Sequence, residues 1–172
     1  MTKTLNAQLD AILAARDREN MTPTLQALLP IYEQYPNNPR VFYELGGAYD
    51  TAGEEATALG LYEDAMAEGL TGEIRRRCYL QYGSTLRNLG RFEDSSAVFS
   101  RARSEFPESA ALAVFESLTL HAAGRAATAV ASLLTLLSDR LDDPELHRYE
   151  PAIRDYAQDL FSLDAEAVRP AR

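Results

Sequence analysis

Histidine, cysteine and carboxylate side chains are the groups in this sequence that could form a metal site or a nucleophilic catalytic site. The two histidines, His121 and His147, are 26 residues apart, without the carboxylate–histidine spacing of a zinc site. Cys78 is the only cysteine, so it has no partner for an internal disulfide. Because no nucleophile–base pair is recognisable, we expect no catalytic site, no metal and no cofactor.

Three consecutive arginines, Arg75 to Arg77, are the strongest local concentration of positive charge in an acidic chain. They lie near the start of a predicted helix, where positive charge opposes the helix dipole by ~0.3–1 kcal/mol per group. Glu68, Glu73 or Asp64 is expected to offset this charge. The alternative is that the arginines bind an acidic segment of a partner.

The composition is that of an ordinary globular protein, with 172 residues, 46% of them hydrophobic and 25% charged. A chain of this length can bury a core without a disulfide or a metal. The net charge of −9 repels nucleic acid and anionic membrane surfaces, so neither is an expected partner. The longest charge-free apolar stretch, residues 126–137, is too short to cross a bilayer. With no signal-peptide pattern and a lone cysteine, we expect a cytoplasmic protein.

The elements that would position any site are revealed by an internal repeat. Gly46, Gly83 and Ser117 are 37 and then 34 residues apart, and the same two intervals separate several other sets of similar residues. These sets are Gly53, Gly90 and Gly124; Tyr49, Leu86 and Leu120; Ala58, Ser95 and Ala129; Tyr62, Phe99 and Leu133; and Ala65, Ala102 and Leu136.

The chemistry of the repeated positions predicts pairs of antiparallel helices. A glycine inside a helix, as at Gly46, costs ~1 kcal/mol relative to alanine, so its recurrence indicates close approach of a neighbouring helix. Glycines such as Gly53 fall where one helix ends and the next begins, and they suit the left-handed conformation of a helix cap. The sequence therefore predicts helices near 4–18, 23–35, 39–52, 55–68, 72–89, 92–106, 109–123 and 125–141.

These positions resemble the tetratricopeptide repeat. The first clear copy reads Leu45-Gly46-x-x-Tyr49, Gly53, Ala58, Tyr62 and Ala65, and the second reads Tyr82-Gly83-x-x-Leu86, Gly90, Ser95, Phe99, Ala102 and Pro107. Residues 38–50 and 83–91 are similar to the bacterial subfamily often called tetratricopeptide repeat group 5, and the likeness covers residues 38–162. The resemblance implies an all-α fold, a right-handed α-α superhelix of about three to four helix pairs with a C-terminal capping helix.

The chain is accordingly predicted to form a single helical-repeat domain over residues 1–172. Its predicted parts are a divergent leading pair (5–37), repeat 1 (38–70), repeat 2 (71–107), a degenerate repeat 3 (108–141), a capping helix (142–163) and a disordered tail (164–172). Repeat 3 is degenerate because Glu116 replaces a large apolar residue, which leaves open a slip of one residue toward Phe115. In the capping helix, Pro151 interrupts the apolar run and is expected to begin a second short helix rather than to kink a single one.

The resemblance also implies that the first helix of each pair lines a concave groove. We expect Arg40, Tyr43, Arg77, Gln81, Arg87 and Asn88 to hydrogen-bond an extended peptide or its carboxylate, and Phe115 and Leu118 to accept an apolar side chain. Glu44 and Asp50 complete the candidate groove residues. The alternative is that the capping helix occupies the apolar part and the arginines pair with nearby acids.

The leading interpretation is a non-catalytic scaffold or adaptor that binds a protein or peptide segment in this groove. A second interpretation is a self-associating structural module, a homodimer with no open groove. A small hydrolase or transferase is a remote third.

Overall fold

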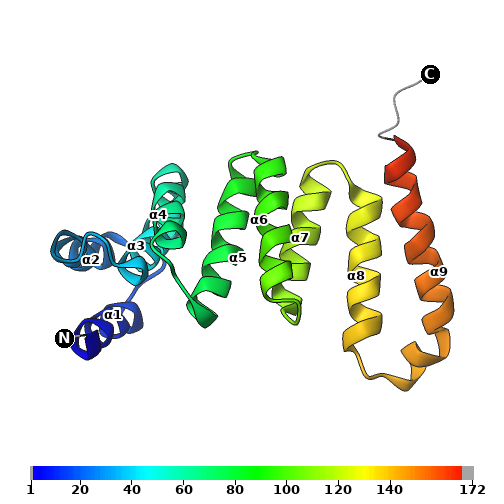
Figure 1. Cartoon of the computed structure of the whole chain (residues 1–172), viewed down its shortest axis with the longest axis horizontal. Coiled ribbons are helices and arrows are strands. Elements are labelled where there is room, and N and C mark those ends of the chain that lie inside the picture. Colours follow the sequence, from blue (N-terminus) through cyan, green and yellow to red (C-terminus); the bar gives the residue numbers. More distant parts are fainter. Residues whose placement is uncertain (1, 168–172) are drawn as a thin grey trace. The chain divides into compact units, whose positions relative to one another are not determined.

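The computed structural model describes residues 2–167, and every regular element in that range is a helix (Figure 1). The chain divides into two compact units, residues 1–89 and 90–172. The first unit contains α1 (Thr2–Ala14), α2 (Thr22–Gln34), α3 (Pro39–Thr51), α4 (Glu55–Ala67) and α5 (Gly72–Asn88). The second contains α6 (Phe92–Glu105), α7 (Ala110–Ala122), α8 (Ala126–Arg140) and α9 (Pro144–Ala167). The predicted all-α fold class is confirmed, whereas the single domain and its division into repeats stay predictions.

Helices of the first unit pack against each other in sequence order. Each of α1 to α4 contacts the helix that follows it, and α3 also contacts α5. The core between them includes Leu9, Leu28, Leu45 and Tyr62, none of which is more than 2% exposed. Because α3 and α5 are the first helices of successive pairs, their contact brings side chains from both helices to one surface.

The start of α3 is fixed by its N-cap. The side-chain oxygen of Asn38 accepts hydrogen bonds from the backbone N–H groups of Arg40, at 3.1 Å, and Val41, at 3.2 Å. Pro39 follows as the first helical residue, where a missing N–H costs nothing. A cap of this kind stabilises a helix by about 1 kcal/mol. It also sets the register in which the polar side chains of α3 project.

Gly46 lets α3 and α4 approach closely, as its recurrence in the sequence predicts. A Cβ atom at this position would lie 3.0 Å from the Tyr62 ring and 3.3 Å from the Cβ of Leu61. Gly53 then ends the helix with a φ of +81°, and its N–H donates to the carbonyl oxygen of Asp50 at 3.0 Å. The two glycines thus serve different purposes, one in packing and one in the turn.

In the second unit, α6 contacts α7, α7 contacts α8, and α8 contacts α9, which runs antiparallel to it (Figure 1). Between α6 and α7, the buried hydroxyls of Ser95 and Thr119 lie 2.9 Å apart and form a hydrogen bond. Glu116 of α7, which the sequence has in place of an expected large apolar residue, forms an ion pair of 2.7 Å with Arg103 of α6.

The C-terminal helix differs from the sequence-based expectation in two respects. Pro151 lies inside α9 and does not begin a second helix. Residues 164–167, predicted to belong to a disordered tail, continue α9. Asp164 accepts hydrogen bonds at 2.7 Å from both the backbone N–H and the hydroxyl of Thr128, which ties this end of α9 to the first turn of α8. The rest of the predicted tail, residues 168–172, lies outside the described residues.

Candidate functional site

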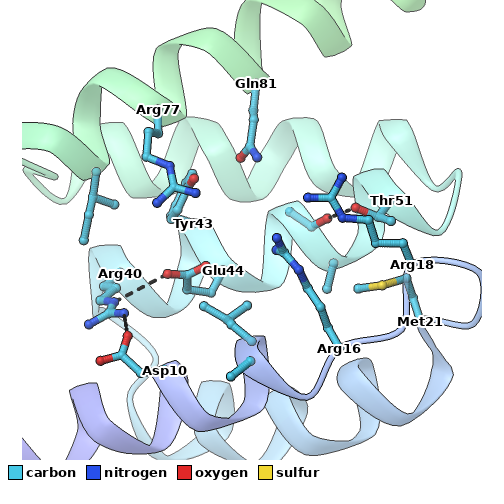
Figure 2. Close-up of a pocket in the computed structure, with 15 residues that line it drawn as sticks. Asp10, Arg16, Arg18, Met21, Arg40, Tyr43, Glu44, Thr51, Arg77 and Gln81 are labelled. Carbon is cyan, nitrogen blue, oxygen red and sulfur yellow. Dashed lines mark hydrogen bonds and ion pairs between the residues drawn. The ribbon is translucent and has the colours of Figure 1, made fainter.

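A cavity of about 410 Å³ opens in the first unit, between α1, the segment that follows α1, α3 and α5 (Figure 2). We call it the unit 1 cavity. Its lining residues come from α1, from the segment that follows α1, from α3 and from α5, and they carry several guanidinium and carboxylate groups. They are Asp10, Leu13, Ala14, Arg16, Arg18, Met21, Arg40, Tyr43, Glu44, Gly47, Ala48, Thr51, Ile74, Arg77 and Gln81.

The α3 wall is formed by residues three and four positions apart, which share one face of the helix. Arg40, Glu44 and Thr51 lie on this face, and Gly47 keeps it open. Arg40 is held on both sides, by an ion pair with Asp10 of α1 and by a hydrogen bond of 3.5 Å from its Nε to Glu44. Because two carboxylates already engage Arg40, its charge is largely neutralised within the unit.

Burial and positive charge act in opposite directions on the α3 side chains. Burial raises the pKa of Glu44, while Arg40, Arg77 and Arg16 favour its ionised form and lower that pKa. Burial likewise raises the pKa of Tyr43 to about 12, against the opposing charge of Arg77. Arg16 acts on Tyr43 in the same sense as Arg77. The guanidinium groups of three separate elements therefore contribute to the electrostatic potential of the cavity.

The α5 wall contributes Arg77 and Gln81, four residues apart. Figure 2 shows both side chains extending from α5 toward α3. The side-chain amide oxygen of Gln81 is buried, and no hydrogen bond reaches it from the residues that the structure describes. A buried acceptor without a donor costs ~1–3 kcal/mol, so this atom is a natural contact for a ligand N–H group.

Two lining arginines were not among the residues predicted from the sequence. Arg16 and Arg18 lie in the segment between α1 and α2, and Figure 2 shows Arg16 reaching toward α3. The sequence assigned both to the end of a helix over residues 4–18, whereas α1 ends at Ala14. Two arginines at alternate positions of a short connection were the only sequence signal.

Of the predicted groove residues, Arg40, Tyr43, Glu44, Arg77 and Gln81 lie around this cavity. The others lie elsewhere. Asp50 is bound by Thr85 and Tyr62, and Asn88 donates to Glu55 at 3.0 Å. Arg87 is half-buried, and burial lowers its pKa. Phe115 and Leu118 belong to α7 of the second unit, where Phe115 is half-buried and Leu118 is 45% exposed. The peptide-binding roles of all ten residues stay predictions.

The three consecutive arginines have different surroundings. Arg76 forms an ion pair with Glu73, one of the acids expected to offset the run. Arg75 donates to the carbonyl oxygen of Leu70 and to the hydroxyl of Tyr79, each at 3.0 Å. Arg77 instead faces the unit 1 cavity. The run is therefore offset in part by a local acid and in part by polar groups.

Among residues 2–167, no group of three or more histidine, cysteine or acidic side chains is arranged to hold a metal ion. None of the helices in that range has the length and apolar character needed to span a bilayer.

A family model described as tetratrico peptide repeat matches residues 39–160. The chain belongs to the tetratricopeptide repeat family. The resemblance inferred from the repeated glycines is thereby confirmed. A search among curated proteins finds no match.

The tetratricopeptide repeat match begins at the first residue of α3 and ends within α9. Tetratricopeptide repeats are helical modules of protein interaction, which is the general function that the family supports. The matched range includes Arg40, Arg77 and Gln81 but excludes Arg16 and Arg18. One wall of the unit 1 cavity therefore lies outside the tetratricopeptide repeats that the family model matches.

Proposed function

We propose that this protein is a non-catalytic interaction module and that it binds a peptide or protein segment in the unit 1 cavity. The supporting observation is the cavity itself, which gathers side chains from the first helices of successive pairs within one compact unit. The polar lining favours a partner with several hydrogen-bonding groups over a small apolar ligand, because small-molecule pockets are mostly apolar. An extended peptide has such groups at every residue.

A displayed library of random peptides, selected on the full-length protein, tests this function. Peptides that bind the wild-type chain are then titrated by fluorescence anisotropy against Thr51→Trp, which places a large ring at the edge of the cavity. The matched control is Thr57→Trp on α4, because Thr57 is also an exposed helical threonine but does not line the cavity. We expect Thr51→Trp to weaken binding at least about tenfold, a loss of ~1.4 kcal/mol, and Thr57→Trp to leave it unchanged. Failure to select any peptide, or equal affinity for both variants, would contradict the proposal.

A second candidate function, self-association, is favoured by exposed apolar side chains on the second unit. Tyr149, Tyr156 and Leu163 of α9 are seven residues apart, so they form a line along the helix, and they are 54%, 67% and 57% exposed. A line of this spacing is typical of helix–helix contacts. Sedimentation velocity across a concentration series would detect a dimer, and Tyr156→Ser should abolish it. A monomer at every concentration would exclude this function.

We infer that the chain has no catalytic activity. Cys78, its one thiol, is buried and its pKa is raised to about 12, so it would be a poor nucleophile. His121 and His147 are both exposed in the second unit. The lone cysteine also supports a reducing compartment such as the cytoplasm. Hydrolytic turnover by the purified chain on a panel of ester and phosphoester substrates would contradict this inference.

A further inference from the structure

We propose that the unit 1 cavity selects an acidic protein segment, whose carboxylates are bound by Arg16, Arg18 and Arg77. We call these residues the arginine triad. This inference rests on the proposed function, because it specifies the chemistry of the segment that the cavity binds.

Arg40 and the triad differ in their ion pairs. Four arginines and two carboxylates line the cavity, and both carboxylates, on Asp10 and Glu44, engage Arg40. The guanidinium groups of the triad form no ion pair and no side-chain hydrogen bond with the residues that the structure describes. The cavity thus carries an excess of positive charge in a chain whose net charge is −9.

The acids near the triad leave the excess of positive charge in place. The charges of Arg77 and Arg16 lower the pKa of Glu44, but Glu44 forms its ion pair with Arg40. Glu73, which acts electrostatically on Arg77, forms its ion pair with Arg76. Asp17 and Glu19 flank Arg18 in the sequence, but neither lines the cavity.

Carboxylates are the groups that this arrangement fits. A guanidinium group presents several N–H donors in one plane, and a carboxylate can accept two of them at once. Arg77 projects from α5, whereas Arg16 and Arg18 project from the segment after α1, so the triad lies on two walls of the cavity. An extended segment with two or more acidic side chains would bridge these walls.

Gln81 adds a second recognition feature of a different kind. Its buried side-chain oxygen lies between the α5 and α3 walls, 3.7 Å from the position of a Cβ at Gly47. A backbone N–H of the bound segment would satisfy this acceptor. A peptide supplies both the carboxylates and the N–H group, whereas a simple inorganic anion supplies neither N–H donors nor a chain long enough to span the walls.

Nucleic acid also carries negative charge, but the molecule is poorly suited to it. The net charge of −9 repels an extended polyanion, and Asp10 and Glu44 line the same cavity as the triad. The three arginines are exposed, and they line a single cavity of about 410 Å³ in one unit and form no extended positive surface along it. We therefore favour an acidic protein segment over a nucleic acid, and the experiment includes both.

The test uses the full-length chain and three fluorescein-labelled probes: an oligoglutamate peptide, an oligoglutamine peptide of equal length and a single-stranded oligonucleotide. We expect the oligoglutamate to bind at least about tenfold more tightly than the oligoglutamine, and its affinity to fall as salt is raised. Arg77→Gln and the double variant Arg16→Gln/Arg18→Gln should each weaken oligoglutamate binding at least about tenfold. The double variant Arg101→Gln/Arg148→Gln, which removes two exposed arginines from the second unit, is the charge-matched control and should bind normally.

The outcomes distinguish this inference from the proposed function. Equal loss of affinity in the triad variants and in the control would overturn it, because the effect would then reflect net charge alone. In another outcome, the selected library peptides lose affinity for Thr51→Trp, lack acidic residues and bind the triad variants as tightly as wild type. That result would support the proposed function and show that the acidic specificity is wrong. Oligonucleotide binding as tight as that of oligoglutamate, with the same dependence on the triad, would overturn the assignment to carboxylates. Circular dichroism melting curves of each variant establish that it is folded.

Discussion

Thr85 of α5 donates a hydrogen bond of 3.2 Å to Asp50 of α3, so one side-chain contact joins two helices that are separated in sequence by α4. The other carboxylate oxygen of Asp50 accepts a bond of 3.3 Å from the hydroxyl of Tyr62 on α4. Burial raises the pKa of Asp50, and the bonds from Thr85 and Tyr62 act to lower it. This carboxylate therefore links three helices of the first unit.

Replacing Asp50 should destabilise the first unit. Asp50→Ala would leave the hydroxyl of Tyr62 without this acceptor in a buried setting, whereas the hydroxyl of Thr85 also donates to the carbonyl oxygen of Gln81 at 2.9 Å. We expect a loss of ~1–3 kcal/mol in the free energy of unfolding. Thr85→Val, which keeps the shape of the side chain, should cost about 1 kcal/mol. Urea unfolding of both single variants and the double variant gives the coupling energy. A coupling near zero would show that the contact contributes nothing, and Asp64→Ala controls for the loss of an exposed carboxylate.

Alanine substitutions at two adjacent glycines should have opposite effects on stability. At Gly46 the added Cβ would lie 3.0 Å from the Tyr62 ring, so this fully buried ring must move by a few tenths of an ångström and we expect a loss of ~1–3 kcal/mol. At Gly47 the nearest atom is 3.7 Å away, which is an ordinary contact, so the higher helix propensity of alanine should stabilise by up to about 1 kcal/mol. Thermal and urea unfolding of the two variants measure the difference. Equal effects would mean that the close approach of α3 and α4 does not limit the side chain at Gly46.

Cys78 should resist alkylation until the chain unfolds. The thiol is fully buried, and burial raises its pKa to about 12 even though the charge of Arg75 acts in the opposite direction. At pH 8 the thiolate should be about a thousandfold scarcer than for an ordinary cysteine, so the reaction with iodoacetamide should slow at least in proportion. Intact-mass spectrometry with and without urea follows the modification. Labelling at the same rate in both conditions would contradict the buried position of the thiol.

The contact between Asp164 and Thr128 should make the second unit sensitive to acid. The two hydrogen bonds from Thr128 lower the pKa of Asp164, so the carboxylate stabilises the folded state at neutral pH. Because the folded-state pKa is the lower one, this stabilisation is present above the ordinary carboxyl pKa of about 4 and is lost as the pH falls through the folded-state value.

The measurement is the melting temperature of wild type and Asp164→Ala between about pH 3 and pH 7. We expect the variant to melt at a lower temperature near neutral pH and the difference to shrink toward the acid end of the range. Asp159→Ala removes an exposed carboxylate from the same helix and serves as the control. A difference between wild type and Asp164→Ala that does not change with pH would show that the ionised carboxylate is not the stabilising species.

Much of the fold was predictable because its contacts connect elements that are close in sequence. The recurrence of Gly46 predicted the close approach of a neighbouring helix, and the structure shows that the contact at this glycine is with the Tyr62 ring at 3.0 Å. The continuity of α9 was harder to predict, because a proline removes a backbone donor but does not always end a helix. At the end of α9, Asp164 contacts Thr128, which lies 36 residues away in the sequence. A contact at that separation leaves no periodic signal in the sequence.

The candidate site was predictable only for the walls that carry the repeat motif. The positions of Arg40 on α3 and Arg77 on α5 follow from the helical register. The helical register does not reveal which arginine already has an ion-pair partner. Arg40 pairs with Asp10, which lies 30 residues away in the sequence. Arg16 and Arg18 lie in a connection without a motif, where the direction of a side chain is set by the local backbone and by neighbouring helices.

The position of Arg16 and Arg18, ahead of the matched residues 39–160, has a consequence for how specificity is encoded. The matched residues supply the helical framework and Arg77, whereas the preceding segment supplies Arg16 and Arg18, two of the three arginines that we propose to bind carboxylates. Two proteins with near-identical repeats could therefore prefer oppositely charged ligands if their leading segments differ. Trimming the chain to its recognisable portion for expression would remove that discrimination together with α1 and α2.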